Sequence, residues 1–189
     1  MRRLVYAAPA LVLLLLPATA FASLGVESTF IRLLTAGGPT GNERILWSGK
    51  FTILPDTNGI SPRTEDLVFT LESFEPDPAS PDGGAFVQQY SALVPAGELT
   101  SADGGLTWSL APDATTTLET LDVTALPGGA FMVDLLDRHA SLPDVDYDTV
   151  RVTLGIGDDS GSAVSAMFTE GNQWLIAPAP AAGAPIPPE

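Results

Sequence analysis

Short stretches in which apolar residues alternate with polar ones recur along the whole chain. The alternation is clear over Leu67–Leu71 and again over Val150–Ile156. Successive side chains of an extended strand point to opposite faces, so a period of two rich in β-branched and aromatic residues predicts half-buried β-strands. The other segments predicted as strands are Glu27–Leu34, Arg44–Leu54, Ala85–Val94, Leu106–Leu110, Leu118–Ala125, Phe131–Leu135, Val164–Phe168 and Gln173–Ile176.

The segments between these strands are rich in residues that favour turns. Ala102–Gly105, Leu126–Gly129 and Gly157–Gly161 all contain glycines, which tolerate positive φ at little cost. No stretch downstream of residue 22 keeps a helical period beyond about two turns. About nine or ten strands in this length predict an all-β fold, namely an antiparallel β-sandwich of two sheets packed face to face, with a closed barrel as the alternative.

Two segments of the chain echo one another. Phe51–Leu54, an acidic loop and Leu67–Leu71 are followed about 80 residues later by Phe131–Asp134, a second acidic loop and Val150–Leu154. Each copy reads as strand, loop and strand. The echo suggests two related halves, as would suit a sandwich, although so few identities are also compatible with chance.

The first 22 residues have the three parts of a cleavable secretory signal. Arg2 and Arg3 precede the apolar run Leu4–Leu16, and the small residues Ala20 and Ala22 mark a peptidase site before Ser23. The alternative is an uncleaved membrane anchor, but Leu4–Ala22 is at the lower length limit for a span and contains two prolines, Pro9 and Pro17. We therefore expect a signal peptide at 1–22, a β domain at 23–176 and a Pro/Ala-rich disordered tail at 177–189, in an exported protein that is periplasmic, on the cell surface or extracellular.

Charge and composition exclude several classes of function. The chain carries a formal charge of −15, which becomes −17 when Arg2 and Arg3 leave with the signal peptide, since all 23 acidic residues follow it. This balance disfavours nucleic acid and anionic membrane surfaces as partners, because both require a basic footprint. Cysteine is absent and His139 is the single histidine, so thiol catalysis, disulfides and multi-histidine metal sites within one chain are excluded. An unknown protein or envelope partner is the expectation that remains.

The strongest metal-binding candidate is the run of carboxylates at Asp144, Asp146 and Asp148. Carboxylates at i, i+2 and i+4 in a loop can converge on calcium, which takes six to eight oxygen ligands. The EF-hand pattern fails further along, because Thr149 and Gly155 stand where Gly and Glu are needed. The alternative, which we favour, makes the aspartates a solvent face at the entrance to a strand, with Val145 and Tyr147 pointing inward.

Other residues attract a functional and a structural interpretation. Asp158 and Asp159, and likewise Asp56 and Asn58, lie in Gly-flanked turns where Asp and Asn are favoured as backbone caps. Three tryptophans, Trp47, Trp108 and Trp174, could form a platform for a sugar. Trp108 alternates with Leu106 and Leu110, so core packing is the expectation for at least two of the three. His139 is expected to be an exposed loop residue.

No catalytic signature emerges from these residues. With 23 acids, some pair of carboxylates will always lie close enough for glycoside hydrolysis, so proximity by itself does not discriminate. The sequence therefore favours an exported, non-catalytic β-sandwich with a structural or interaction role at the envelope or outside the cell, without a cofactor. A calcium-dependent or carbohydrate-binding module is the second hypothesis, and a carboxylate-based hydrolase the third.

Overall fold

The described part of the chain consists of strands joined by turns and bends. The computed structural model describes residues 24–34, 43–55, 59–143, 145–171 and 173–176, and these residues form no helix, hence none that could cross a membrane. The predicted signal peptide and C-terminal tail lie outside the described residues. The eleven strands are β1 (Leu24–Leu34), β2 (Glu43–Ile53), β3 (Leu67–Pro76), β4 (Gly84–Val94), β5 (Leu99–Thr100), β6 (Thr107–Leu110), β7 (Thr120–Leu126), β8 (Ala130–Ala140), β9 (Thr149–Ile156), β10 (Asp159–Glu170) and β11 (Gln173–Ile176).

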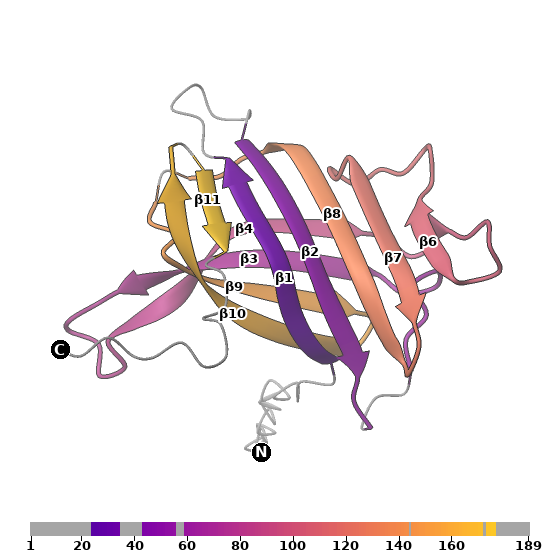
Figure 1. The fold of residues 1–189 in the computed structure, drawn as a ribbon, viewed down its shortest axis with the longest axis horizontal. Helices are drawn as coiled ribbons and strands as arrows, with labels where there is room; N and C mark the ends of the chain where they lie inside the picture. Colours follow the sequence, from indigo (N-terminus) through magenta and orange to yellow (C-terminus); the bar gives the residue numbers. More distant parts are fainter. Residues whose placement is uncertain (1–23, 35–42, 56–58, 144, 172, 177–189) are drawn as a thin grey trace, which may run out of the picture.

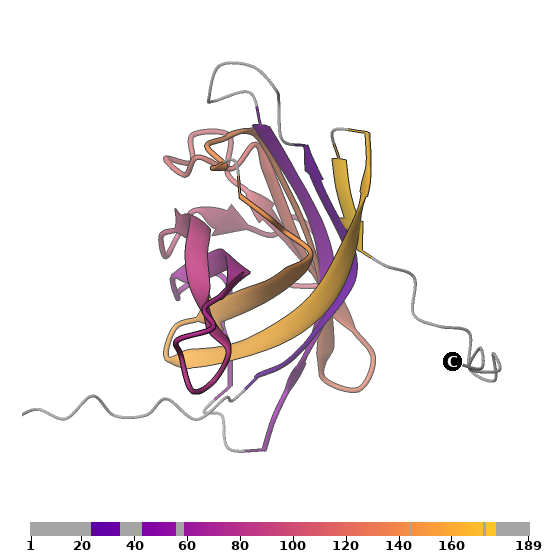
Figure 2. The ribbon, with the colours of Figure 1, turned by 90° about the vertical axis from the view of Figure 1, so that its left-hand side faces the viewer.

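All eleven strands belong to one antiparallel sheet in the order β4-β3-β9-β10-β11-β1-β2-β8-β7-β6-β5. The expected division into two separate sheets is not found, because β10 pairs with β9 over residues 159–166 and with β11 over residues 167–170. A strand of 12 residues is long enough to serve both halves, and Figure 2 shows it bending from one layer to the other. The fold is thus an all-β curled sheet, or half-barrel.

The curl brings two layers of strands face to face over a single core. In Figure 1, β1, β2, β8 and β7 cross in front of β3, β4, β9 and β10. Trp47 on β2 reaches Phe69 on β3, with ring centroids 5.2 Å apart, and both side chains are fully buried. Phe69 in turn lies 6.2 Å from the ring of Tyr90 on β4. The Trp47–Phe69 contact joins the two layers, and burying such large side chains supplies much of the stabilisation of the fold.

The two echoing segments pair with each other. β2 is hydrogen-bonded to β8, where Phe51 stands opposite Phe131 with the rings stacked 4.9 Å apart. β3 is likewise hydrogen-bonded to β9, where Thr70 stands opposite Thr153. The equivalent strands of the two predicted halves therefore lie side by side in both layers of the molecule.

Gly161 allows β10 to approach β1 closely. A Cβ added at Gly161 would lie 2.0 Å from the carbonyl oxygen of Leu24, a separation that no side chain tolerates. Because both partners are backbone, relief would require one strand to move. The close approach of β10 to β1 thus depends on the absence of a side chain at this position.

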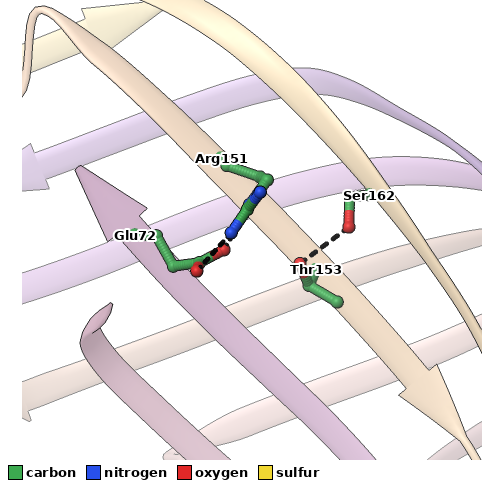
Figure 3. Close-up of polar contacts among 4 residues, drawn as sticks. All are labelled: Glu72, Arg151, Thr153 and Ser162. Atoms are coloured by element: carbon green, nitrogen blue, oxygen red, sulfur yellow. Dashed lines mark hydrogen bonds and ion pairs between the residues drawn. The ribbon is translucent and has the colours of Figure 1, made fainter. Parts of the chain in front are cut away.

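The outward face of β3, β9 and β10 carries polar cross-strand pairs (Figure 3). Arg151 holds Glu72 through two hydrogen bonds, of 2.5 Å from Nε and 2.6 Å from Nη2, and its guanidinium lies 4.5 Å from the centre of the Phe86 ring. The hydroxyls of Thr153 and Ser162 are 2.8 Å apart. On β9 the alternation is realised as apolar residues facing the core and polar residues facing out, whereas on β10 the predicted apolar row is exposed, Val164 at 60% and Phe168 at 41%.

Candidate functional site

Two of the three predicted calcium ligands, Asp146 and Asp148, lie in the loop that precedes β9. Asp144 is outside the described residues, while Asp146 and Asp148 are exposed on either side of the fully buried Tyr147. The Asp146 carboxylate accepts a hydrogen bond of 2.9 Å from the backbone N–H of Asp148, which is the geometry of a local turn. In the described ranges, no three His, Cys, Asp or Glu side chains gather where they could hold a metal. Calcium binding by the full set of three stays a prediction.

The second acidic cluster divides between surface and interior. Asp158 is exposed at the turn between β9 and β10, whereas Asp159 opens β10 and is only 5% exposed, with Oδ2 lacking a hydrogen-bond partner. Of the other predicted turn, only Gly59 is described, and Asp56 and Asn58 lie outside the described residues. The structure therefore brings no second carboxylate of these clusters to Asp159 among the residues it describes.

The three tryptophans occupy different environments. Trp47 is a core residue, 1% exposed, as its place in an alternating strand implies. Trp174 is half-buried and packs edge-on against Tyr147 at 6.0 Å. Trp108 is also half-buried, but it lines a pocket as well as packing against Phe131 at 6.2 Å.

His139 lies on β8 rather than in a loop, although it is exposed as expected. It borders a pocket of about 430 Å³ between β4 and the end of β8, which also includes Tyr90, Thr117 and Asp137. We refer to it as the Tyr90–Asp137 pocket. A tyrosine, a carboxylate and a histidine in one depression are residue types that can carry acid–base chemistry, so their bonding decides what the pocket can do.

The carboxylate of Asp137 is the common acceptor of the hydrogen bonds within the Tyr90–Asp137 pocket. The Tyr90 hydroxyl donates to Oδ2 of Asp137 at 2.7 Å, and the backbone N–H of His139 donates to Oδ1 at 2.8 Å. Burial raises the pKa of the Tyr90 hydroxyl far above its usual range, and its hydrogen bond to the Asp137 carboxylate raises it further. Tyr90 therefore stays protonated at neutral pH and both oxygens of Asp137 are engaged. This arrangement fastens β4 to β8 across the core and leaves neither the Tyr90 hydroxyl nor the Asp137 carboxylate free to act as a base.

A second pocket, of about 510 Å³, is lined by residues on and around β6. Figure 1 shows β6 near one end of the curled sheet. We call it the Arg63–Trp108 pocket. Its lining comes from the loop before β3, from the turn between β4 and β5, and from the β5–β6 hairpin. The residues that line it are Arg63, Gly97, Leu99, Thr100, Ser101, Gly104, Gly105 and Trp108.

Hydrogen bonds within the β5–β6 hairpin give this pocket its shape. The Asp103 carboxylate accepts from the backbone N–H of Leu106 at 3.0 Å, from that of Thr107 at 2.8 Å and from the Ser101 hydroxyl at 2.9 Å. The Ser101 hydroxyl in turn accepts from the N–H of Gly105 at 2.8 Å. The hydrogen bond from Thr107 is the main reason that the pKa of Asp103 lies below its ordinary value. The loop is thus held by an ionised carboxylate.

Glycines leave the indole of Trp108 open to the pocket. Gly104 and Gly105 both have positive φ, of 77° and 92°, so a side chain at either position would be strained. The position of a Cβ at Gly105 is 3.5 Å from the Trp108 ring, while at Gly97 and Gly104 it would meet nothing within 4 Å. Side chains at these positions would occupy pocket space, and their absence exposes the ring.

The Arg63–Trp108 pocket has the composition of a binding site. Among the described residues that line it there is no Asp, Glu or His, so none of its side chains could act as a general acid or base at neutral pH. It combines one aromatic surface, one cation and the hydroxyls of Thr100 and Ser101. Few ligand pockets need more than an apolar surface and a small number of polar groups.

Sequence reasoning missed this pocket for an identifiable reason. Trp108 alternates with Leu106 and Leu110, but Leu106 lies before β6 and is 62% exposed, so the alternation did not mark a core-facing row. The paired glycines at Gly104 and Gly105 were interpreted only as a turn. Arg63 had no sequence signal beyond being one of few cations.

Comparison of the chain with protein-family models, with curated proteins and with solved structures found no match.

Proposed function

We propose that this chain is an exported, non-catalytic β domain that acts by binding a partner at the cell envelope or outside the cell. The observation that carries the proposal is the Arg63–Trp108 pocket, whose described lining offers a ring, a cation and hydroxyls but no acid or base. The signal motif at 1–22 supports export, with the domain starting at Ser23. The proposal does not require a cofactor.

The arrangement of the carboxylates supports binding over hydrolysis. Asp122 on β7 and Asp134 on β8 stand opposite each other, but they lie on the outward face and each accepts a hydrogen bond from a serine hydroxyl, Ser109 and Ser48 respectively. Asp137 is occupied by Tyr90 and by the His139 amide. A glycosidase needs two free carboxyls facing each other across a cleft. A hydrolase is therefore the weakest of the three hypotheses.

Carbohydrate binding is the form of this function that a specific observation favours. The face of a pyranose ring presents C–H groups with partial positive charge, which suit the negative face of an aromatic ring. Trp108 supplies such a ring with its edge bounded by glycine. Calcium-dependent binding would instead use Asp144, Asp146 and Asp148, and of these the two described residues, Asp146 and Asp148, do not line the pocket.

The proposal is tested by sedimentation of the secreted protein with insoluble cellulose, chitin and peptidoglycan. We expect retention on at least one polymer, loss of that retention in Trp108→Leu, and no release of reducing ends. Trp174→Leu is the matched control, because Trp174 is also half-buried but does not line the pocket. Binding through Arg63 and Trp108 is expected to survive a calcium chelator. Equal retention of Trp108→Leu and the wild type, or polymer cleavage by the wild type, would contradict the proposal.

A further inference from the structure

Arg63 is an exposed cation in a strongly acidic protein, and the described residues offer its guanidinium no partner. The described residues form two ion pairs, Arg138 with Glu119 and Arg151 with Glu72, and the Arg63 side chain has no hydrogen bond or ion pair with any described residue. Its backbone is nevertheless anchored, because the Arg63 carbonyl accepts a hydrogen bond of 2.9 Å from the N–H of Gly97. An anchored residue with an unpaired charge at a pocket calls for an explanation.

The two acidic residues closest to Arg63 in the sequence make hydrogen bonds with backbone amides. Glu65 accepts a hydrogen bond of 2.5 Å from the N–H of Ser61 and lies against Gly157, where an added Cβ would be 2.8 Å from its Oε1. Asp66 accepts a hydrogen bond of 2.8 Å from the N–H of Ala96. The two carboxylates nearest in sequence are thus bound by backbone amides. Arg63 remains available to an anion from outside the protein.

The rest of the pocket restricts the kind of anion that fits. Leu99 is 1% exposed, so Trp108 provides the only substantial apolar surface among the described lining residues. The remaining described lining consists of glycines and of the hydroxyl residues Thr100 and Ser101. A ligand matched to this surface has one apolar face and polar edges, which is the character of a sugar ring rather than of a hydrophobic acid.

We propose that the Arg63–Trp108 pocket binds an acidic saccharide, with a uronic acid ring on Trp108 and its carboxylate on Arg63. A guanidinium matches a carboxylate through two parallel N–H···O hydrogen bonds, which a neutral hydroxymethyl group or ester does not reproduce. This inference rests on the proposed function and adds the ligand class. The charge of the domain as a whole repels an anionic polymer, so the local contact with Arg63 has to provide the attraction.

The experiment compares soluble oligogalacturonate with its fully methyl-esterified form, which has the same sugar rings without the charge. Calorimetric titration of the secreted protein should show at least tenfold tighter binding of the acid than of the ester. Arg63→Gln should lower the affinity for the acid to that for the ester and leave the ester unchanged. Arg44→Gln is the matched control, because Arg44 is also exposed but does not line the pocket.

Three outcomes would overturn the inference, and they separate it from the proposed function. Equal affinity for acid and ester, both lost in Trp108→Leu, would refute the acidic ligand and leave a neutral-sugar site in place. Tight binding of the acid that Arg63→Gln does not weaken would place the anion elsewhere. Absence of binding to either oligosaccharide, together with retention on insoluble polymers that Trp108→Leu does not change, would refute both proposals.

Discussion

The Tyr90–Asp137 pocket and the Arg63–Trp108 pocket are similar in size, about 430 and 510 Å³, but they use their polar groups in opposite ways. In the first, a buried carboxylate is saturated by a tyrosine hydroxyl and a backbone amide. In the second, Arg63 and Trp108 line the pocket, and the carboxylates of Glu65 and Asp66 accept hydrogen bonds from backbone amides. Saturated groups hold a protein together, and unsatisfied groups at a surface are available to a ligand.

The positions of the two pockets in the sheet fit this difference. Tyr90 and Asp137 belong to the long strands β4 and β8, which lie in opposite layers, so their hydrogen bond closes the curl across the core. Arg63 and Trp108 belong to a loop and to the four-residue strand β6 at the end of the sheet. Functional residues commonly lie on loops that a rigid scaffold positions. The comparison therefore predicts that substitutions in the first pocket affect stability and those in the second affect binding.

The largest effect on stability is expected from Asp137→Ala. Loss of this carboxylate leaves the Tyr90 hydroxyl and the His139 amide without an acceptor in the interior, which should cost about 3 kcal/mol of unfolding free energy. Asp134→Ala is the control on the same strand, because Asp134 is exposed and opposes Asp122. Urea unfolding measures both. A loss of less than about 1 kcal/mol for Asp137→Ala would show that the hydrogen bonds accepted by Asp137 do not stabilise the fold.

Tyr90→Phe tests the hydrogen bond between Tyr90 and Asp137 through the pH dependence of stability. At neutral pH the loss of the hydroxyl should cost about 2 kcal/mol, since Asp137 loses a donor to a buried charge. Because burial raises the pKa of Tyr90 above its ordinary value of 10.0, the contribution of Tyr90 is fully present below pH 10 and is lost as pH rises through the raised pKa. The stability difference between wild type and Tyr90→Phe should therefore narrow above pH 10. A difference in unfolding free energy that does not change with pH would contradict the hydrogen bond from the Tyr90 hydroxyl to Asp137.

Asp103→Ala should produce a local effect in the second pocket. Its carboxylate holds the amides of Leu106 and Thr107, so these amides should exchange with solvent faster in the variant, as hydrogen exchange by NMR would show. Because the pKa of Asp103 is lowered, the stabilisation of the loop is present above the ordinary value of 3.8 and is lost as pH falls through the lowered pKa. Amides around Tyr90 should be unaffected. Faster exchange there as well would mean that the two pockets are coupled.

The smallest change in stability is expected from Arg63→Gln. The side chain has no partner among the described residues, so the unfolding free energy should stay within about 0.5 kcal/mol of the wild type while affinity for an acidic saccharide falls. Urea unfolding and calorimetric titration of one preparation measure both quantities. A loss of stability comparable to that of Asp137→Ala would remove the contrast between the two pockets.

Local patterns allowed much of the fold to be predicted. Ten of the eleven strands overlap segments predicted from alternation, and Gln173–Ile176 matches in both bounds. The strand that was missed, β5, has two residues, too few to establish a period of two. The inward orientation of Tyr147 between exposed aspartates was also predicted correctly, because alternation applies equally to an extended segment before a strand.

What the sequence by itself determined was the class of fold, the approximate position of ten of the eleven strands and the buried face of most of them, because strand periodicity is a property of neighbouring residues. Only the tertiary structure decided that one sheet curls through β10. It also decided that Glu65 and Asp66 accept hydrogen bonds from backbone amides and form no ion pair with Arg63. The tertiary structure also decided that Trp108 packs against the hydrophobic core and at the same time lines a pocket. The physical reason is that alternation assigns a side chain to a face of a sheet, whereas what covers that face depends on strands and loops far away in the chain.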